Sequence, residues 1–223
     1  MLKTILKITG LLILIGIAVF IIINYKADIP VEVLKAKYTT AESKFMNIDG
    51  MSVHYRDEGQ ADDSVPLVLI HGTSSSLLTW NACTDVWKKT HRVIRFDLPA
   101  FALTGPNADN VYTFERYVDF VNKVLENLKV NRCIVVGNSL GGAITWQYAY
   151  RYSQKVKKMI LIDAGGYKFK RGGGAVGFKL TATLGQIPVL KNFLYYITPN
   201  NVVKKSVEGA YYDKSKISQE TVD

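Results

Sequence analysis

Four short apolar segments recur along the middle of the sequence, and each of them ends in a loop of glycine, proline or polar residues. They are PLVLIHG (66–72), HRVIRFDLP (91–99), RCIVVGN (132–138) and VKKMILIDAGG (156–166). Continuous apolar runs of this length are typical of strands that are buried on both faces of a sheet. Helical stretches separate these segments. That alternation predicts a parallel sheet with helices packed on both of its faces.

The helices are expected in SLLTWNACTDVWKKT, in YTFERYVDFVNKVLENLKV (112–130) and in GGAITWQYAYRYSQK (141–155). In the second of these the apolar residues recur at helical spacing, and Thr113 is expected to be the N-cap. Before them, SKFMNIDGMSVHYRDEG (43–59) predicts a β-hairpin, because Asp49-Gly50 suits a tight turn between alternating strands. The predicted fold class is therefore α/β, with a mostly parallel, doubly wound sheet.

Sites in such sheets form in the loops at the carboxyl ends of the strands. One of these loops is a G-x-S-x-G pentapeptide, Gly137-Asn138-Ser139-Leu140-Gly141, which follows an apolar strand and opens a helix. A strand–turn–helix nucleophile elbow has this arrangement, with small residues where the strand and the helix approach each other. We predict that Ser139 is a nucleophile, with the Leu140 N–H as one oxyanion donor and the Thr73 N–H as the second.

With these motifs in place, the chain resembles the α/β-hydrolase superfamily, and within it the membrane-anchored, lid-bearing, esterase-like branch. The resemblance rests on HGTSSSLLTW, VIRFDLPAFALTG, VVGNSLGGAI and MILIDAGGY, and it covers residues 38–167. It implies a Ser139 nucleophile, an oxyanion hole from Thr73 and Leu140, and a lid after the sixth strand. It implies neither a cofactor nor a metal site. One departure is Ala100 and Ala102, which stand where the family usually has glycine.

A larger departure concerns the base, because a serine hydroxyl is nearly inert until a base takes its proton. The family places its acid and then its histidine after the serine, but no histidine follows Ser139 here. Of the earlier histidines, His71 is expected to be structural, His54 lies within the hairpin, and His91 opens its strand at the edge far from Ser139. Asp163, which ends the sixth strand, is either the orienting acid or a stabiliser of the glycine turn after it.

These observations leave two interpretations of the function. The first is that the chain is the N-terminal portion of a longer serine hydrolase, truncated before the histidine and inactive alone, which acts on an ester-like carbonyl. The second is a non-catalytic, membrane-anchored protein that lacks the base. In that case VKKMILID (156–163) would be a bare apolar sheet edge, which favours aggregation unless a partner covers it.

The remainder of the chain, 167–223, is predicted to be the start of the lid. Gly172-Gly173-Gly174-Ala175-Val176-Gly177 matches G-x-G-x-x-G but does not follow a strand directly, so we interpret it as a lid hinge rather than a dinucleotide site. Apolar residues of this region suggest an apolar small-molecule substrate, or equally contacts between lid helices. They are Phe178, Leu180, Phe193, Leu194, Tyr195 and Tyr196.

The first residues predict a membrane anchor. ILKITGLLILIGIAVFIIINY (5–25) carries no charge between Ile8 and Ile23 and is apolar on every face. A helix of that length spans about 31 Å, close to the thickness of a bilayer core. The segment has no A-x-A-like cleavage site, so we expect an uncleaved single-pass anchor rather than a signal peptide. Lys3 and Lys7 precede the span, which favours a cytoplasmic N-terminus and an extracytoplasmic globular part.

The predicted organisation is thus an anchor over 1–25, a juxtamembrane linker over 26–42, the hydrolase core over 43–166 and the lid over 167–223. The net charge of +9 comes from scattered lysines and arginines. No basic face is evident, so we do not predict nucleic-acid binding. Cys83 and Cys133 lack the spacing of metal ligands and are expected to be buried free thiols.

Overall fold

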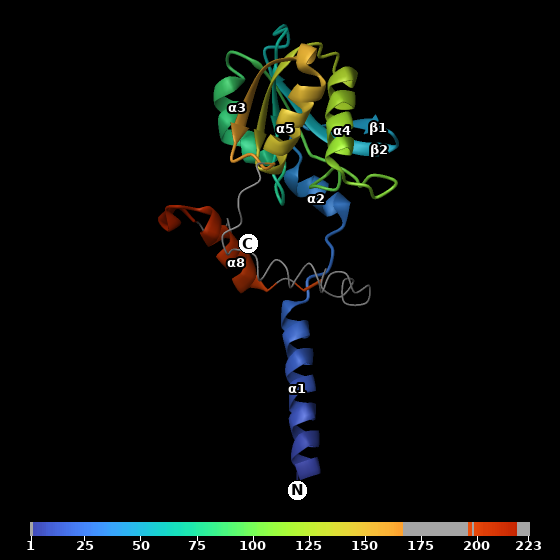
Figure 1. Ribbon diagram of the computed structural model, residues 1–223, viewed down its shortest axis with the longest axis vertical. Helices are drawn as coiled ribbons and strands as arrows, with labels where there is room; N and C mark the ends of the chain where they lie inside the picture. The colour runs from blue at the N-terminus through green and yellow to red at the C-terminus, as the bar shows by residue number, and fades with distance from the viewer. Residues whose placement is uncertain (1, 167–195, 198, 218–223) are drawn as a thin grey trace. The chain divides into compact units, whose positions relative to one another are not determined.

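The computed structural model describes residues 2–166, 196–197 and 199–217 (Figure 1). Contacts between residues group the chain into two compact units, one over 1–29 with 170–223 and the other over 30–169, and each unit is described separately. The predicted lid hinge at 172–177 lies outside the described residues. So do all of the apolar lid residues named above except Tyr196, which is exposed.

In its described part, the larger unit is built on a sheet of six strands in the order β1-β2-β4-β3-β5-β6. The strands are β1 (Lys44–Ile48), β2 (Met51–Gly59), β3 (Leu67–Ile70), β4 (Arg92–Phe96), β5 (Cys133–Asn138) and β6 (Val156–Ile162). The hairpin strands β1 and β2 pair antiparallel, as β2 does with β4, whereas the other three pairings are parallel. The mostly parallel α/β sheet is confirmed.

Helices cover both faces of this sheet. The short helix η1 (Leu77–Trp80) and α3 (Asn81–Trp87) lie on one face, and α4 (Phe114–Asn127) and α5 (Leu140–Arg151) lie on the other (Figure 1). The N-cap prediction for α4 is confirmed, because the Thr113 hydroxyl accepts a hydrogen bond from the Arg116 N–H. A turn of 3-10 helix, η2 (Ser153–Lys155), leads from α5 into β6.

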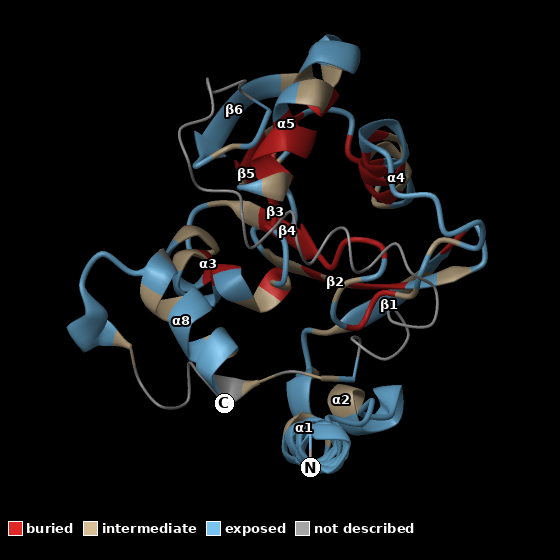
Figure 2. Cartoon of the chain, turned by 60° about the horizontal axis from the view of Figure 1, so that its bottom comes forward, coloured by how far each residue is buried: buried red, intermediate tan, exposed pale blue. Residues whose placement is uncertain are grey.

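The strands supply apolar residues to two cores, one on each face, which explains their continuous apolar runs. On the α4 and α5 side, Val68 and Ile70 of β3 join Ile94 and Phe96 of β4 in the larger cluster. On the α3 side, Leu67 and Leu69 pack with Trp80 and Val93. Figure 2 shows the buried residues concentrated along β3, β4 and β5 and on the inner sides of α4 and α5. The paired cores hold the carboxyl ends of these strands in fixed positions.

The two cysteines differ in burial. Cys133 at the start of β5 is fully buried, as expected, whereas Cys83 in α3 is partly exposed, so the prediction of two buried thiols is wrong for Cys83. Cys83 packs at the margin of the smaller cluster rather than inside it. Both are free thiols.

The segment before the hairpin contains a helix, α2 (Val31–Tyr38), within the stretch that the sequence suggests is a linker. The ammonium group of Lys35 lies 5.4 Å above the centre of the Phe45 ring of β1. The Arg56 guanidinium of β2 donates to the Tyr38 carbonyl over 3.3 Å. These contacts attach α2 to the hairpin, and it belongs to the same compact unit as the sheet.

The outermost strands of the described sheet are β1 and β6. In β6, the four residues Met159, Ile160, Leu161 and Ile162 are between 39% and 49% exposed. Within the described residues, β6 is therefore an apolar edge, as the sequence predicts.

The smaller unit contains α1 (Leu2–Asn24), α8 (Asn200–Ala210) and the short helix η3 (Lys214–Lys216). Among the described helices, α1 is long and apolar enough to cross a membrane, and none of its residues is buried. A signal sequence would share this length and composition. The Lys26 N–H donates to the Tyr196 carbonyl over 2.7 Å, and the Tyr25 and Tyr196 rings stack.

Candidate active site

The predicted nucleophile occupies a strained turn between β5 and α5. Ser139 has φ 51° and ψ −111°, a left-handed conformation that is unfavourable for a residue with a side chain. Three backbone hydrogen bonds hold it there. Its N–H donates to the Ile162 carbonyl over 2.9 Å, and its carbonyl accepts from the N–H groups of Ala143 and Gly165, both over 3.0 Å. Ser139 is an exposed residue.

The two glycines of the pentapeptide allow the backbone to pack closely around this turn. A Cβ atom on Gly137 would lie 2.2 Å from the Gly141 carbonyl oxygen. A Cβ atom on Gly141 would lie 2.2 Å from the Ile70 carbonyl oxygen of β3. Any side chain at either position would force α5 away from the sheet, so the geometry of the turn requires glycine at both.

The loop after β3 lies directly against the serine. A Cβ atom on Gly72 would be 3.2 Å from Ser139 Cβ and 3.0 Å from Asn138 Oδ1. The His71 ring donates through Nδ1 to the Gly72 carbonyl over 2.8 Å, and its Nε2 accepts from the Leu98 N–H over 3.0 Å. Since a peptide group is planar, the bond to the Gly72 carbonyl also fixes the orientation of the Thr73 N–H.

Burial lowers the pKa of His71, which keeps its imidazole uncharged near neutral pH. Only an uncharged ring can donate at Nδ1 and accept at Nε2 at the same time. The structural role predicted for His71 therefore matches its position, since both of its ring nitrogens are occupied in holding the loop beside Ser139.

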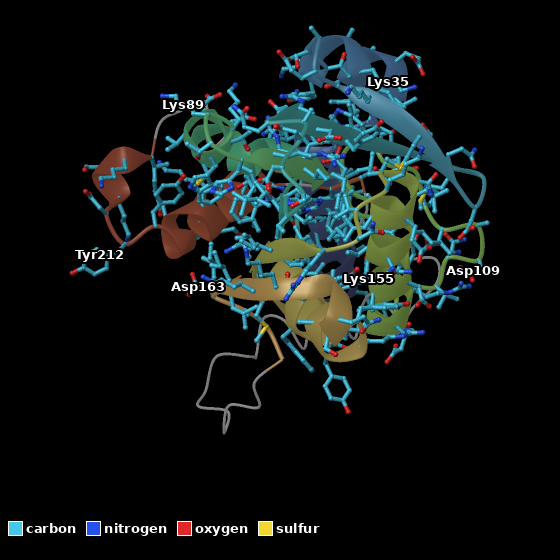
Figure 3. All side chains as sticks on the ribbon, turned by 90° about the horizontal axis from the view of Figure 1, so that it is seen from above. Lys35, Lys89, Asp109, Lys155, Asp163 and Tyr212 are labelled. Carbon is cyan, nitrogen blue, oxygen red and sulfur yellow. The ribbon has the colours of Figure 1, made fainter. Side chains whose placement is uncertain are left out.

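The other predicted site residues lie around the same turn. Leu140 is the first residue of α5, so its N–H is among those that have no partner within the helix and lie at the positive end of the helix dipole. Asp163 directly follows β6, is exposed and has φ 45°. Figure 3 shows Asp163 and Lys155 at opposite ends of β6. Asp163 lies between Ile162 and Gly165, which both bond the Ser139 backbone.

Neither of the remaining histidines is placed to act as a base. His54 is buried, with Nδ1 2.8 Å from Asp97 Oδ2 and Nε2 3.0 Å from Ser43 Oγ. His91 precedes β4 and has Nδ1 3.2 Å from Asp63 Oδ2, at the amino end of the strand. The chain of contacts through Ser43, His54 and Asp97 is not apparent in the sequence, because strand register alone brings these residues together.

The two alanines of the loop after β4 have an unfavourable backbone conformation. Ala100 and Ala102 have φ 64° and 48°, the left-handed conformation that glycine adopts without a steric penalty. Between them, Phe101 packs edge-on against the His71 ring, with the ring centres 5.4 Å apart. The loop thus supports the histidine that holds Gly72. Within the described residues, no cluster of three or more His, Cys, Asp or Glu side chains could hold a metal ion.

A serine on a strained strand–turn–helix junction beside a glycine loop, at the carboxyl edge of a mostly parallel sheet, is the arrangement of an alpha/beta hydrolase fold. The family model for the alpha/beta hydrolase fold matches residues 47–178, more than half of the chain. The chain belongs to this family, and the resemblance of its motifs to the α/β-hydrolase superfamily is confirmed.

Individual relatives are hydrolases of moderate similarity. The chain is 27% identical to the uncharacterized hydrolase YugF of Bacillus subtilis over 79% of this chain and 62% of that protein. It is 27% identical to a 2-hydroxy-6-oxo-2,4-heptadienoate hydrolase of Pseudomonas putida over 78% of this chain and 58% of that protein. The chain therefore spans about six-tenths of the length of these two relatives.

Solved structures give the same result. The meta-cleavage product hydrolase CumD from Pseudomonas fluorescens IP01 superposes with a TM-score of 0.65 and 26% identity, over 80% of this chain and 60% of that one. The Cfl2 protein of Burkholderia cenocepacia superposes with a TM-score of 0.68 at 19% identity, over 81% of this chain and 63% of that one, which shows a shared fold.

Proposed function

We propose that this chain carries the nucleophile and the oxyanion hole of a serine hydrolase that acts on an ester-like carbonyl. The observation that supports this most strongly is the placement of Ser139. Its backbone is held in a strained conformation by Ile162, Ala143 and Gly165, and its Cβ would lie only 3.2 Å from a Cβ atom placed on Gly72. Strain of this kind is retained where the exposure of a side chain serves a function.

In the proposed reaction, Ser139 Oγ attacks the carbonyl carbon while a base removes its proton. The carbonyl oxygen becomes an oxyanion, which the N–H groups of Thr73 and Leu140 stabilise. Loss of one such donor typically lowers kcat by about 10²–10³-fold. The Leu140 N–H lies at the positive end of the α5 dipole, which further stabilises the oxyanion. His71 orients the Thr73 N–H through its bond to the Gly72 carbonyl.

We further propose that the base is a histidine in a longer protein of which this chain is the N-terminal portion. Two facts support this proposal. The histidines at 54, 71 and 91 are engaged elsewhere, and the chain spans only 62% and 58% of its two hydrolase relatives. Asp163 is the candidate for the acid that orients this histidine, since it lies in the turn that borders Ser139.

The membrane assignment is part of the same proposal. α1 is an uncleaved single-pass anchor. Its N-terminus lies in the cytoplasm, and the hydrolase unit lies on the extracytoplasmic side of the membrane. Extraction of membranes with alkaline carbonate tests this. An anchor predicts that the protein stays in the pellet with residues 2–24 intact, whereas a cleaved signal sequence predicts that these residues are missing from the mature protein.

Two substrate classes can be tested side by side. The apolar character of the predicted lid favours small apolar esters. The 2-hydroxy-6-oxo-2,4-heptadienoate hydrolase among the relatives makes that keto acid the second candidate. A non-catalytic protein is the alternative function, and it predicts turnover of neither class.

The test is hydrolysis of p-nitrophenyl esters of increasing chain length, and of the keto acid, by the protein as its gene encodes it in its own membrane. We expect Ser139→Ala to lower the rate by at least about 10³-fold. Ser153→Ala, an exposed serine just after α5, is the matched control and should leave the rate unchanged. Turnover that survives Ser139→Ala would overturn the proposal, and absence of turnover would favour the non-catalytic alternative.

A further inference from the structure

We propose that Ser43 and His54 are positioning residues of the oxyanion loop, acting through Asp97 on the segment that carries Thr73. A continuous chain of hydrogen bonds runs from the Thr40–Ser43 turn, just after α2, to the loop between β3 and α3. The effect of these residues on catalysis rests on the proposed function. The contacts themselves can be tested without any turnover.

The carboxylate of Asp97 is the centre of the chain, and it is only 1% exposed. Its Oδ1 accepts from the Leu77 N–H over 2.8 Å, and its Oδ2 accepts from the Leu103 N–H over 3.2 Å. The next residue, Leu98, donates its N–H to His71 Nε2 over 3.0 Å. The end of β4 therefore holds the 71–77 loop at both of its ends, with Thr73 between them.

His54 orients that carboxylate. Its Nδ1 lies 2.8 Å from Asp97 Oδ2, and the ring is buried. The His54 backbone is fixed by the same region, because its N–H donates to Thr104 Oγ1 and its carbonyl accepts from the Asp97 N–H, both over 3.0 Å. The backbone gives each oxygen of this buried carboxylate one donor, and His54 adds a second, shorter contact to Oδ2.

Ser43 and Asp97 both favour the His54 tautomer with its hydrogen on Nδ1. The Ser43 hydroxyl oxygen already accepts from the Thr40 N–H and from Arg56 Nε, both over 3.2 Å. A hydroxyl has two acceptor positions and one proton, so the proton remains for His54 Nε2, 3.0 Å away. His54 must then hold its own hydrogen on Nδ1, which faces Asp97.

The order Ser43, His54, Asp97 matches that of a catalytic triad, but Ser43 is unsuited to be a second nucleophile. Both acceptor positions of its oxygen are occupied by N–H donors, so no lone pair remains for a carbonyl carbon. The Arg56 guanidinium that bonds Ser43 also donates to the Tyr38 carbonyl and ties the turn to the end of α2. The geometry therefore indicates that these hydrogen bonds position the loop and take no part in chemistry.

The first experiment measures hydrogen exchange by mass spectrometry on the full chain in detergent micelles, in peptides that cover 72–80 and 98–105. Ser43→Ala removes the hydroxyl that bonds His54 Nε2 and so holds the ring in place against Asp97. We expect about tenfold faster exchange of the Leu77 and Leu103 amides, because loss of a typical partly buried hydrogen bond has about that effect. Ser43→Thr keeps the hydroxyl and should restore the original rates. Ser52→Ala, an exposed serine on the same hairpin, is the matched control.

Unchanged exchange of both peptides in Ser43→Ala would overturn the proposal. Equal acceleration in every peptide of the chain would also overturn it, because Ser43 would then only support global stability. A second measurement needs no variant: the ¹⁵N shifts of the His54 ring should show a protonated Nδ1 and an unprotonated Nε2, and the opposite tautomer would refute the chain of bonds.

The effect on catalysis is measured separately, by the kinetics of ester hydrolysis. If Ser139 hydrolyses esters as proposed, Ser43→Ala should lower kcat about tenfold and leave KM unchanged, since the loop contacts the oxyanion rather than the bound substrate. Absence of ester hydrolysis in the unmodified protein would count against the proposed function alone. The exchange and tautomer results would still decide whether Ser43 and His54 position the loop.

Discussion

Replacement of Gly137 by alanine tests the close approach of β5 and α5 on which the whole site depends. The new Cβ would lie 2.2 Å from the Gly141 carbonyl oxygen and 2.3 Å from Thr145 Oγ1. Ordinary contacts begin near 3.4 Å, so α5 would have to move by 1.2 Å from the first of these atoms (3.4 − 2.2). One of the obstructing atoms is backbone, which cannot rotate away. We therefore expect a loss of about 3 kcal/mol, the upper end of the range for overpacked cores.

A loss of about 3 kcal/mol corresponds to a fall in Tm of about 6–12 °C for a chain of this size. Thermal unfolding in detergent, followed by circular dichroism and tryptophan fluorescence, measures this shift. Gly105→Ala is the matched control, because its Cβ would meet only Met51 Cγ at an ordinary 3.5 Å. If Gly137→Ala melts within about 2 °C of the unmodified protein, a shift below 1 kcal/mol, the elbow geometry described here is wrong.

Three further predictions follow from single residues. Ala100→Gly or Ala102→Gly should raise the free energy of unfolding by about 0.5 kcal/mol each, because relief of the left-handed strain exceeds the entropic cost of glycine; a lower urea midpoint would contradict this. Burial raises the pKa of the Cys133 thiol to about 12, so iodoacetamide at pH 8 should modify Cys83 and spare Cys133 in the native protein, as peptide mass spectrometry will show. Burial lowers the pKa of His71 below the 6.5 of the unfolded chain, so below that pH the unfolded chain binds the extra proton. As the pH is lowered from 6.5, this group should therefore reduce the free energy of unfolding by up to about 1.4 kcal/mol per pH unit. His71→Gln should reduce that slope.

Much of the fold can be predicted from the sequence, because its elements have strong local signals. The apolar runs that become β3 and β5 are bounded by loops, and the helical spacing before Val130 predicts α4 together with its Thr113 cap. The G-x-S-x-G segment combines a strand, a turn and a helix within ten residues. Its position at the carboxyl edge follows from the alternation of strands and helices alone.

Other features depend on contacts between distant parts of the chain, and no local pattern predicts them. α2 lacks a clear apolar period, and it is held by Phe45 and Arg56 of the hairpin. The link from Ser43 to Asp97 joins residues that are 54 positions apart in the sequence (97 − 43), and only the register of β1 on β2 and of β2 on β4 brings them together.

We propose that Ser139 is an activated nucleophile, and covalent labelling tests this most directly. The protein in its native membrane is treated with a fluorophosphonate probe, and the modified peptide is identified by mass spectrometry, with Ser139→Ala as the control. We predict one adduct, on Ser139, that is absent from the variant. Absence of labelling, or an adduct on another residue that persists in Ser139→Ala, would contradict it.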